Sequence, residues 1–166
     1  MPKNPHSKSG GTPALALLAT SGVAYRVHYF EHDPRQTDYG REAASALLAE
    51  AETVFKTLVW EVDGTPCVAL APVTSTVASK KLAKALGGRR AELAASARAE
   101  RLTGSVVGAI SPIALKTPMS VVLDDSALSN ERMYVSAGRR GWEIEISPLD
   151  LVQLTSARVA QIIPDR

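Results

Sequence analysis

A lysine lies inside a stretch whose pattern predicts a β-strand with little contact with solvent. Residues 54–62 are rich in β-forming types, and alternate side chains of a strand share a face. Lys56 would share its face with Leu58 and Trp60, and the opposite face is also largely apolar, which predicts a central strand. Burying an unpaired ammonium is costly, so we expect a partner or a lowered pKa. The alternative is a lysine that reaches solvent from a strand end.

A second candidate is the small-residue segment Gly108-Ala109-Ile110-Ser111-Pro112. Small residues let a backbone approach a ligand closely, and free N–H groups there could hold a carbonyl or phosphate oxygen. The proline would then fix the direction in which the chain leaves. The alternative is an ordinary strand end followed by a turn.

A third candidate is the predicted hairpin that joins two strands near the C-terminus. Ser136 closes one strand and Glu143 is near the start of the next, although plain amphipathic alternation also explains this glutamate. The loop 138–141 carries Arg139 and Arg140, which could contact phosphates or could belong to a solvated turn.

A basic stretch on a predicted helix and its exit is the fourth feature. It contains Lys80, Lys81, Lys84, Arg89 and Arg90. Such a face is usually just solvated, and it points to a nucleic acid only if one is expected on other grounds.

Other chemistries find little support. The sequence has no P-loop and no dinucleotide-binding glycine motif, and its serines lack convincing His/Asp partners. Cys67, the single cysteine, lies in an apolar segment that suits a buried inert thiol. The Cys and His residues show no paired metal-ligand spacing, so we expect neither a metal nor another cofactor. The pattern predicts a cavity with a lysine and no obvious nucleophile.

Composition bounds the class of protein. The chain has 166 residues, 45% hydrophobic and 22% charged, which fits one globular domain. The net charge of +2 is far below that of a protein that coats a duplex, but it permits a local basic patch. No apolar run approaches the roughly 20 residues of a membrane span, and the polar N-terminus lacks a signal core. We therefore expect a cytoplasmic protein.

The elements that would position these residues follow from periodicity and from capping and turn signals. We expect a disordered tail at 1–11 and a single domain over 12–166. The predicted helices are 13–21, 41–51, 79–86 and 95–102, with a last short one from Ser147-Pro148. The predicted strands are 25–30, 54–62, 67–71, 106–110, 119–123, 133–135, 142–146 and 158–163. The elements intermix without a regular βαβ rhythm, which favours an α+β domain with a mixed sheet.

The motifs, taken in order, resemble a known family. They are Thr12-Pro13-Ala14, Glu31-His32-Asp33-Pro34, Phe55-Lys56-Thr57-Leu58, Gly108-Ala109-Ile110-Ser111-Pro112 and the segment from Tyr134 to Gly141. This order is similar to that of the YbaK/EbsC family of Cys-tRNA(Pro) deacylases, which are related to the editing domains of prolyl-tRNA synthetase. The resemblance runs from about Thr12 to about Ile162, and five modest motifs in the right order are specific together.

The resemblance implies an α+β domain around a mixed, partly closed, open-barrel-like sheet, and a pocket for the aminoacyl-adenosine end of a mischarged tRNA. Lys56 matches the family's key lysine, an anchor for the phosphate or ester region of the terminal nucleotide. The matched substrate-binding positions are Phe30, Thr57, Gly108, Ala109, Ile110, Ser111, Pro112, Ser136, Gly138 and Glu143. The substrate cysteine's own thiol would attack the ester to form a thiolactone, which accounts for the missing nucleophile.

Three departures from the family pattern bear on the amino acid that is released. Phe30 stands where tyrosine is common, Ala109 where a second glycine is common, and Glu143 where aspartate is common. The alternatives are editing of another amino acid, such as alanine, and a non-catalytic module that binds tRNA or a synthetase. A Cys-tRNA(Pro) deacylase that acts in trans could do so with prolyl-tRNA synthetase bound as a partner.

Overall fold

The computed structural model describes residues 11–165, so the expected tail lies outside the described residues except for Gly11. The helices are α1 (Pro13–Ser21), α2 (Tyr39–Leu47), α3 (Ser79–Ala85), α4 (Ser96–Thr103) and α5 (Pro148–Thr155), with short 3-10 turns η1 (Ala51–Thr53) and η2 (Asp125–Ser129). The strands are β1 (Tyr25–Tyr29), β2 (Phe55–Val62), β3 (Thr65–Pro72), β4 (Ala91–Leu93), β5 (Ser120–Asp124), β6 (Met133–Ser136), β7 (Trp142–Ile146) and β8 (Arg158–Ala160).

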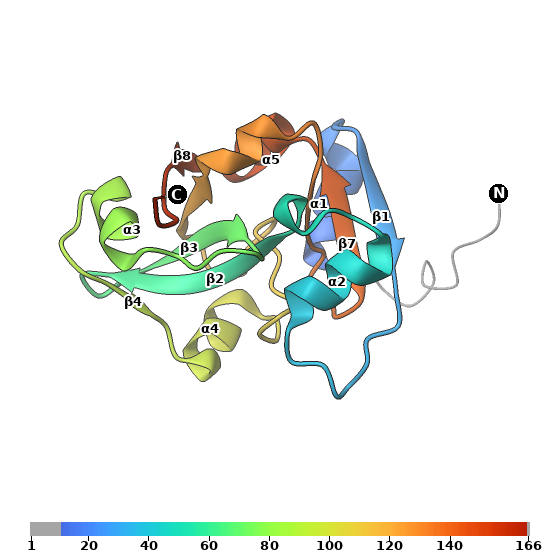
Figure 1. The fold of residues 1–166 in the computed structure, drawn as a ribbon, viewed down its shortest axis with the longest axis horizontal. Helices are drawn as coiled ribbons and strands as arrows, with labels where there is room; N and C mark the ends of the chain where they lie inside the picture. Colours follow the sequence, from blue (N-terminus) through green and yellow to red (C-terminus); the bar gives the residue numbers. More distant parts are fainter. Residues whose placement is uncertain (1–10, 166) are drawn as a thin grey trace.

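The strands form two sheets within one mixed α+β domain, as the fold class predicted. One sheet has the order β4-β2-β3-β5-β8, with antiparallel pairs around β2 and parallel pairs from β3 to β5 and from β5 to β8. The other is the antiparallel sheet β1-β7-β6. A single bridge between Val54 and Tyr134 connects them, and the strands do not close into a barrel. Figure 1 shows α1, β1 and β7 at one end of the molecule and α3 at the other.

The β2–β3 hairpin is the element that carries Lys56, and its register pairs Lys56 with Ala71. Its turn, Asp63-Gly64, has two left-handed residues with φ of 49° and 81°, the combination that matches the twist of a tight hairpin. The Asp63 carboxylate accepts the backbone N–H groups of Arg89 and Arg90 at 2.9 and 3.0 Å, and these bonds lower the pKa of Asp63. The turn is therefore tied to the segment that leads into β4.

Capping residues set both ends of α1 and the start of α5 where the sequence indicated. Thr12 accepts from the backbone of Leu15 at the start of α1, and Gly22 ends that helix with φ of 78°. The prediction for α2 is wrong at both ends. Asp38 is its N-cap, accepting from Arg41 N, so the helix begins at Tyr39, and Leu48 ends it in a left-handed conformation.

One core joins the two sheets. Its largest cluster contains residues of the five-stranded sheet, of the three-stranded sheet, and of α1 and α5, including Leu70, Leu123, Ile144, Leu18 and Leu151. A second cluster lies under α3 and contains Cys67, whose pKa is raised to about 11 by burial. The prediction that this thiol is buried is confirmed, and its raised pKa disfavours the reactive thiolate.

Two local predictions are wrong. Residues 106–110 are turns and loop instead of a strand, because Gly104 and Gly108, with φ of 76° and 88°, bend the chain on both sides. Strand β4 was not predicted, since three residues are too few to show a period; it forms by pairing with Trp60, Glu61 and Val62 of β2. Among the described residues, no helix has the length and apolar character needed to cross a membrane.

Candidate active site

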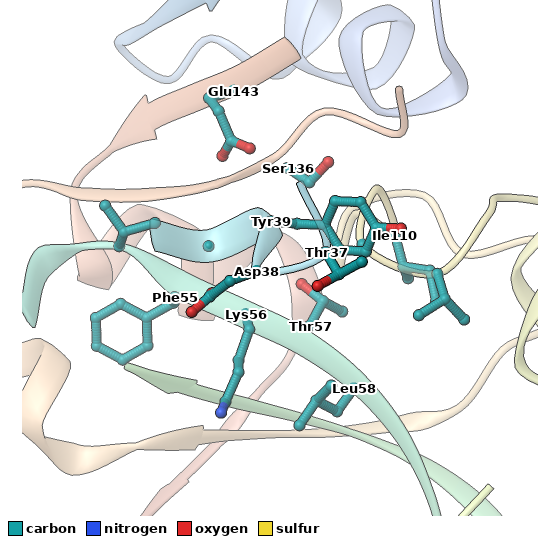
Figure 2. Close-up of a pocket in the computed structure, with 14 residues that line it drawn as sticks. Thr37, Asp38, Tyr39, Phe55, Lys56, Thr57, Leu58, Ile110, Ser136 and Glu143 are labelled. Carbon is teal, nitrogen blue, oxygen red and sulfur yellow. The ribbon is translucent and has the colours of Figure 1, made fainter. Parts of the chain in front are cut away.

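A cavity of about 200 Å³ lies between the start of β2, the N-terminal end of α2, the loop before Ile110, and the β6–β7 hairpin (Figure 2). Its lining consists of Thr37, Asp38, Tyr39, Gly40, Val54, Phe55, Lys56, Thr57, Leu58, Val107, Gly108, Ile110, Ser136 and Glu143. We call it the β2 pocket. It gathers segments that are far apart in the sequence, including three of the motifs singled out above.

Six predicted site residues line the β2 pocket: Lys56, Thr57, Gly108, Ile110, Ser136 and Glu143. The other five lie outside its lining. Phe30 packs against the cluster formed by α2 and Val54, and Ala109 and Pro112 are buried behind the loop. Ser111 and Gly138 line a neighbouring cavity of about 470 Å³ next to Thr12.

An open strand edge explains why neighbouring residues of β2 line one pocket. Strand β4 covers β2 only from Trp60 to Val62, so the stretch Phe55–Leu58 has no strand partner on that side. An uncovered edge presents backbone N–H and C=O groups, with side chains alternating above and below it. Lys56 therefore lies on one side of the pocket edge and Thr57 on the other. The prediction of a central strand is confirmed only for the second half of β2.

The Lys56 side chain is half-buried, on the less buried of the two faces of β2. Burial lowers the pKa of Lys56, and the nearby Asp38 carboxylate opposes this by raising it. In Figure 2 the lysine extends away from Ser136 and Glu143. The ammonium is thus available at the pocket edge, while the buried polar groups lie on the other side of the strand.

Glu143 is buried, with 7% of its surface exposed, and desolvation raises its pKa to about 8. Plain amphipathic alternation, which would put this side chain in solvent, is therefore the wrong interpretation here. Glu145 on the same face of β7 differs, because its carboxylate is bonded to His28 at 3.0 Å and to Tyr134 at 3.1 Å. The Glu143 carboxyl is mostly neutral near neutral pH and faces the pocket.

Two buried hydroxyls accompany this carboxyl. Thr57 Oγ1 and Ser136 Oγ have no hydrogen-bond partner among the described residues. Leaving a buried polar group unpaired costs about 1–3 kcal/mol, so such groups usually serve a ligand or a trapped water. The inner side of the β2 pocket is suited to a small ligand with polar groups of its own.

Position 108 requires a glycine, because the ring of Tyr39 lies against its backbone. Its φ is +88°, and a Cβ atom there would lie 2.2 Å from the ring of Tyr39. From the sequence we expected this backbone to approach a ligand, whereas the close approach in the structure is made within the protein. The group that approaches is the Tyr39 ring, which itself lines the pocket.

Sequence reasoning missed the wall formed by Thr37, Asp38, Tyr39 and Gly40. A signal was present, since Asp38 precedes an acidic first helical turn at Glu42 and is a favourable N-cap residue. The basic stretch from Lys80 to Arg90 does not contribute to the lining. Residues 11–165 contain no group of three His, Cys, Asp or Glu side chains placed to hold a metal ion.

The fold and the pocket together describe a mixed α+β domain with a pocket at an open strand edge, which has a lysine on one side and a buried carboxyl and two buried hydroxyls on the other. The model of the aminoacyl-tRNA editing domain family matches residues 34–154. The chain belongs to this family, which confirms the family predicted from the sequence and its enzyme class, aminoacyl-tRNA deacylase.

Similar proteins agree with this assignment. The chain is 32% identical to EbsC of Enterococcus faecalis, named as a candidate Cys-tRNA(Pro)/Cys-tRNA(Cys) deacylase, over 91% of this chain and 92% of that protein. It is 32% identical to a proline–tRNA ligase of Lysinibacillus sphaericus over 62% of this chain but only 18% of the ligase. A solved structure described as a candidate trans-editing enzyme for prolyl-tRNA synthetase superposes with a TM-score of 0.82 at 24% identity, covering 92% of this chain and 96% of the other. That last likeness shows the fold.

Proposed function

We propose that this protein removes cysteine from mischarged Cys-tRNA(Pro), acting in trans on tRNA released by prolyl-tRNA synthetase. The observation that carries the proposal is the β2 pocket, which gathers Lys56 with Thr57, Ser136 and Glu143 in a member of an editing family. The names of its relatives supply the substrate, because EbsC is named for Cys-tRNA(Pro) and Cys-tRNA(Cys) and the other relative is a proline–tRNA ligase.

The buried groups suit the aminoacyl end of such a substrate. An aminoacyl ester carries an α-ammonium, a carbonyl and a side chain, all within a few bonds of each other. Glu143 is the buried carboxyl that could pair with the ammonium, which would also favour its ionised form. The Thr57 and Ser136 hydroxyls, unpaired among the described residues, could bond to the ester or the side chain.

Lys56 is proposed as an electrostatic anchor for the terminal nucleotide. Its ammonium lies at the solvent-facing side of the strand edge, where a ribose phosphate or the ester oxygen can approach. Asp38 favours the protonated form of the lysine, in opposition to burial. A charged lysine binds and stabilises negative charge but does not accept a proton, so we assign it no role as a general base.

The nucleophile is proposed to arrive with the substrate. The two described histidines are bonded elsewhere, His28 to Glu145 and His32 to Glu42, and neither lines the pocket. Thr57 and Ser136 therefore lack a histidine that could activate them. In the proposed step the cysteine sulfur forms a bond to the carbonyl carbon and loses its proton. The bond between that carbon and the ribose oxygen breaks, and this oxygen takes up a proton, giving a thiolactone and free tRNA.

A deacylation assay tests the proposal. Purified protein is mixed with tRNA(Pro) charged with cysteine, alanine or serine, and the release of each amino acid is followed. We expect cysteine to be released far faster than serine, because a thiol ionises much more readily than a hydroxyl. Release of alanine as fast as cysteine would contradict the thiol step and favour an editor of another amino acid. Binding without release from any of the three would favour a non-catalytic module.

The role of Lys56 is tested in the same assay. We expect Lys56→Ala to lower kcat/KM about 100-fold or more, because it removes the charge that anchors the tRNA end. Lys56→Arg should retain part of the activity, since it keeps the charge with a different shape. Full activity of the alanine variant would exclude the proposed anchor.

A further inference from the structure

Arg140 makes contacts with two segments that are remote from its own hairpin. Its guanidinium donates a hydrogen bond to the carbonyl oxygen of Val107 at 3.2 Å. The same guanidinium lies over the ring of Tyr39, with 4.8 Å between Cζ and the ring centroid. Val107 and Tyr39 both line the β2 pocket, so one exposed side chain joins two of its walls.

Tyr39 is held from other directions as well. The backbone of Gly108 packs directly against its ring, and the His32 ring lies 5.5 Å away, centroid to centroid. His32 is fixed by a hydrogen bond of 2.6 Å to Glu42, whose second carboxylate oxygen accepts the backbone N–H of Asp33 at 2.9 Å. The pocket wall that contains Tyr39, which we call the Tyr39 wall, is therefore held in place from several directions. Arg140 makes its outermost contact.

The third wall is the hairpin to which Arg140 itself belongs. Strand β6 ends at Ser136 and strand β7 carries Glu143, and these two polar residues face the pocket from either side of the loop with Arg140. A displacement of this hairpin relative to the Tyr39 wall would move Ser136 and Glu143 away from Thr57. A misplacement of about 1 Å can cost about 100-fold in rate.

We propose that Arg140 is a positioning residue that holds these three walls of the β2 pocket in register, so that its loss lowers the rate of deacylation more than the affinity for tRNA. The proposal deepens the function proposed above and rests on it. Arg140 touches the pocket only through Val107 and Tyr39, and it is not itself part of the lining.

The neighbouring arginine offers a matched control. Arg139 has the same charge and the same exposed class, but its guanidinium lies over the Trp142 ring, 4.7 Å from the centroid. Neither Arg139 nor the Trp142 that it covers lines the β2 pocket. Substituting Arg139 or Arg140 removes the same charge from the same loop. Comparing the two variants therefore separates the loss of the Arg140 contacts from a general electrostatic effect.

The kinetic experiment compares Arg140→Ala, Arg140→Lys and Arg139→Ala on Cys-tRNA(Pro). We expect Arg140→Ala to lower kcat about tenfold or more with KM within about twofold, since positioning acts on the reacting geometry. Arg140→Lys should recover part of kcat because it keeps a cation and a donor. Arg139→Ala should leave both parameters within about twofold. Tyr39→Leu and the double variant Tyr39→Leu/Arg140→Ala should be about equally impaired, as expected for coupled residues.

A second readout does not depend on activity. Backbone amide exchange is measured in the free protein for residues 37–41 and 105–110. We expect Arg140→Ala to speed exchange in both segments by several fold and Arg139→Ala to change neither, because the Arg140 guanidinium contacts both segments and that of Arg139 lies over Trp142. A further outcome is that the wild-type protein releases no amino acid while Arg140→Ala still speeds amide exchange in both segments. In that case the proposed function is wrong, and the contacts of Arg140 have a structural role only.

Three results would overturn the positioning role. One is an unchanged exchange rate in both segments of Arg140→Ala. Another is an equal loss of kcat in Arg139→Ala. The third is a rise in KM with unchanged kcat and a weaker salt dependence, which would identify Arg140 as a direct phosphate contact.

Discussion

Two glutamates that occupy equivalent positions in the alternating pattern of β7 have pKa values shifted in opposite directions. Glu143 and Glu145 alternate with apolar residues on β7 and face the same side of the sheet. Burial raises the pKa of Glu145, but hydrogen bonds from His28 and Tyr134, together with the charges of His28 and Arg26, outweigh burial and lower it. Glu143 has only burial acting on it, and its pKa is raised. The difference lies in what the neighbouring strands place beside each carboxyl.

The raised pKa of Glu143 predicts a pH-dependent stability. The group titrates at about 4.5 when unfolded and at about 8 when folded. Between these values the folded state holds a proton that the unfolded state has lost, so the free energy of unfolding falls as pH rises through this window. The slope approaches about 1.4 kcal/mol per pH unit for one group. Urea unfolding of wild type and Glu143→Gln across this window measures it, and the variant should lack this part of the decline.

Glu145→Gln is the matched control for this prediction. Because the folded pKa of Glu145 is lowered, its contribution to stability is present above the unfolded pKa and is lost as pH falls. Replacing it should leave the decline between about 4.5 and about 8 in place. An identical pH dependence in wild type and Glu143→Gln would show that Glu143 is not the titrating group.

At the scale of elements, loops and strand edges form the pocket. Strand β2 supplies an open edge because β4 is too short to cover it, and α2 begins early enough to bring Tyr39 against Gly108. The helices and hairpins themselves follow local signals, such as the Thr12 and Ser147 caps and the Asp63-Gly64 turn. The contact between a strand edge and a loop from a distant segment depends on tertiary packing and not on the local sequence.

Gly108→Ala tests the packing of that loop on Tyr39. The new Cβ would lie 2.2 Å from the ring in a backbone conformation with φ of +88°, so the ring or the loop must move. We expect kcat/KM to fall about 100-fold, by misplacement of pocket groups, and stability to fall by at least ~1 kcal/mol. Deacylation kinetics and urea unfolding measure the two effects separately.

Gly104→Ala serves as its control. Gly104 also has a positive φ, +76°, but a Cβ there meets only the Lys116 side chain at 3.4 Å, and the residue does not line the β2 pocket. It should lose ~1–2 kcal/mol of stability from the strained conformation and retain its activity per folded molecule. Equal kcat/KM in the two variants would show that the contact with Tyr39 does not shape the site.

Across the whole molecule, a continuous core fixes the two sheets relative to each other, and a buried aspartate fixes the C-terminal end. Asp124 is fully buried at the end of β5. One of its carboxyl oxygens accepts the backbone N–H of Ile162 at 2.9 Å, and the other accepts from the backbone and hydroxyl of Ser126. This residue joins segments 38 positions apart.

Asp124→Ala should therefore destabilise the fold without altering the chemistry. We expect a loss of ~1–3 kcal/mol in the free energy of unfolding, because the Ile162 N–H is left buried without its acceptor. The exposed neighbour gives the comparison: Asp125→Ala should change stability by no more than ~0.5 kcal/mol. Urea unfolding of both variants measures this, and an equal effect would rule out the buried tie as the cause.

The parts of the structure that depend on neighbours along the chain could be predicted from the sequence. Capping hydroxyls, prolines and turn glycines act over a few residues, so the ends of α1, the β2–β3 hairpin and the β6–β7 hairpin were predictable. The ordered motifs were also enough to identify the editing family and to indicate Lys56, Thr57, Ser136 and Glu143 as candidate site residues.

How these residues come together depends on tertiary packing. Whether a glutamate on an alternating strand is solvated or buried depends on what packs over it, and so the state of Glu143 could not be predicted. The Tyr39 wall, the open edge beside Lys56 and the contacts of Arg140 join distant segments, and Tyr39 and Arg140 are 101 positions apart (140 − 39). Such contacts form because the core brings the two sheets together, and no local pattern encodes them.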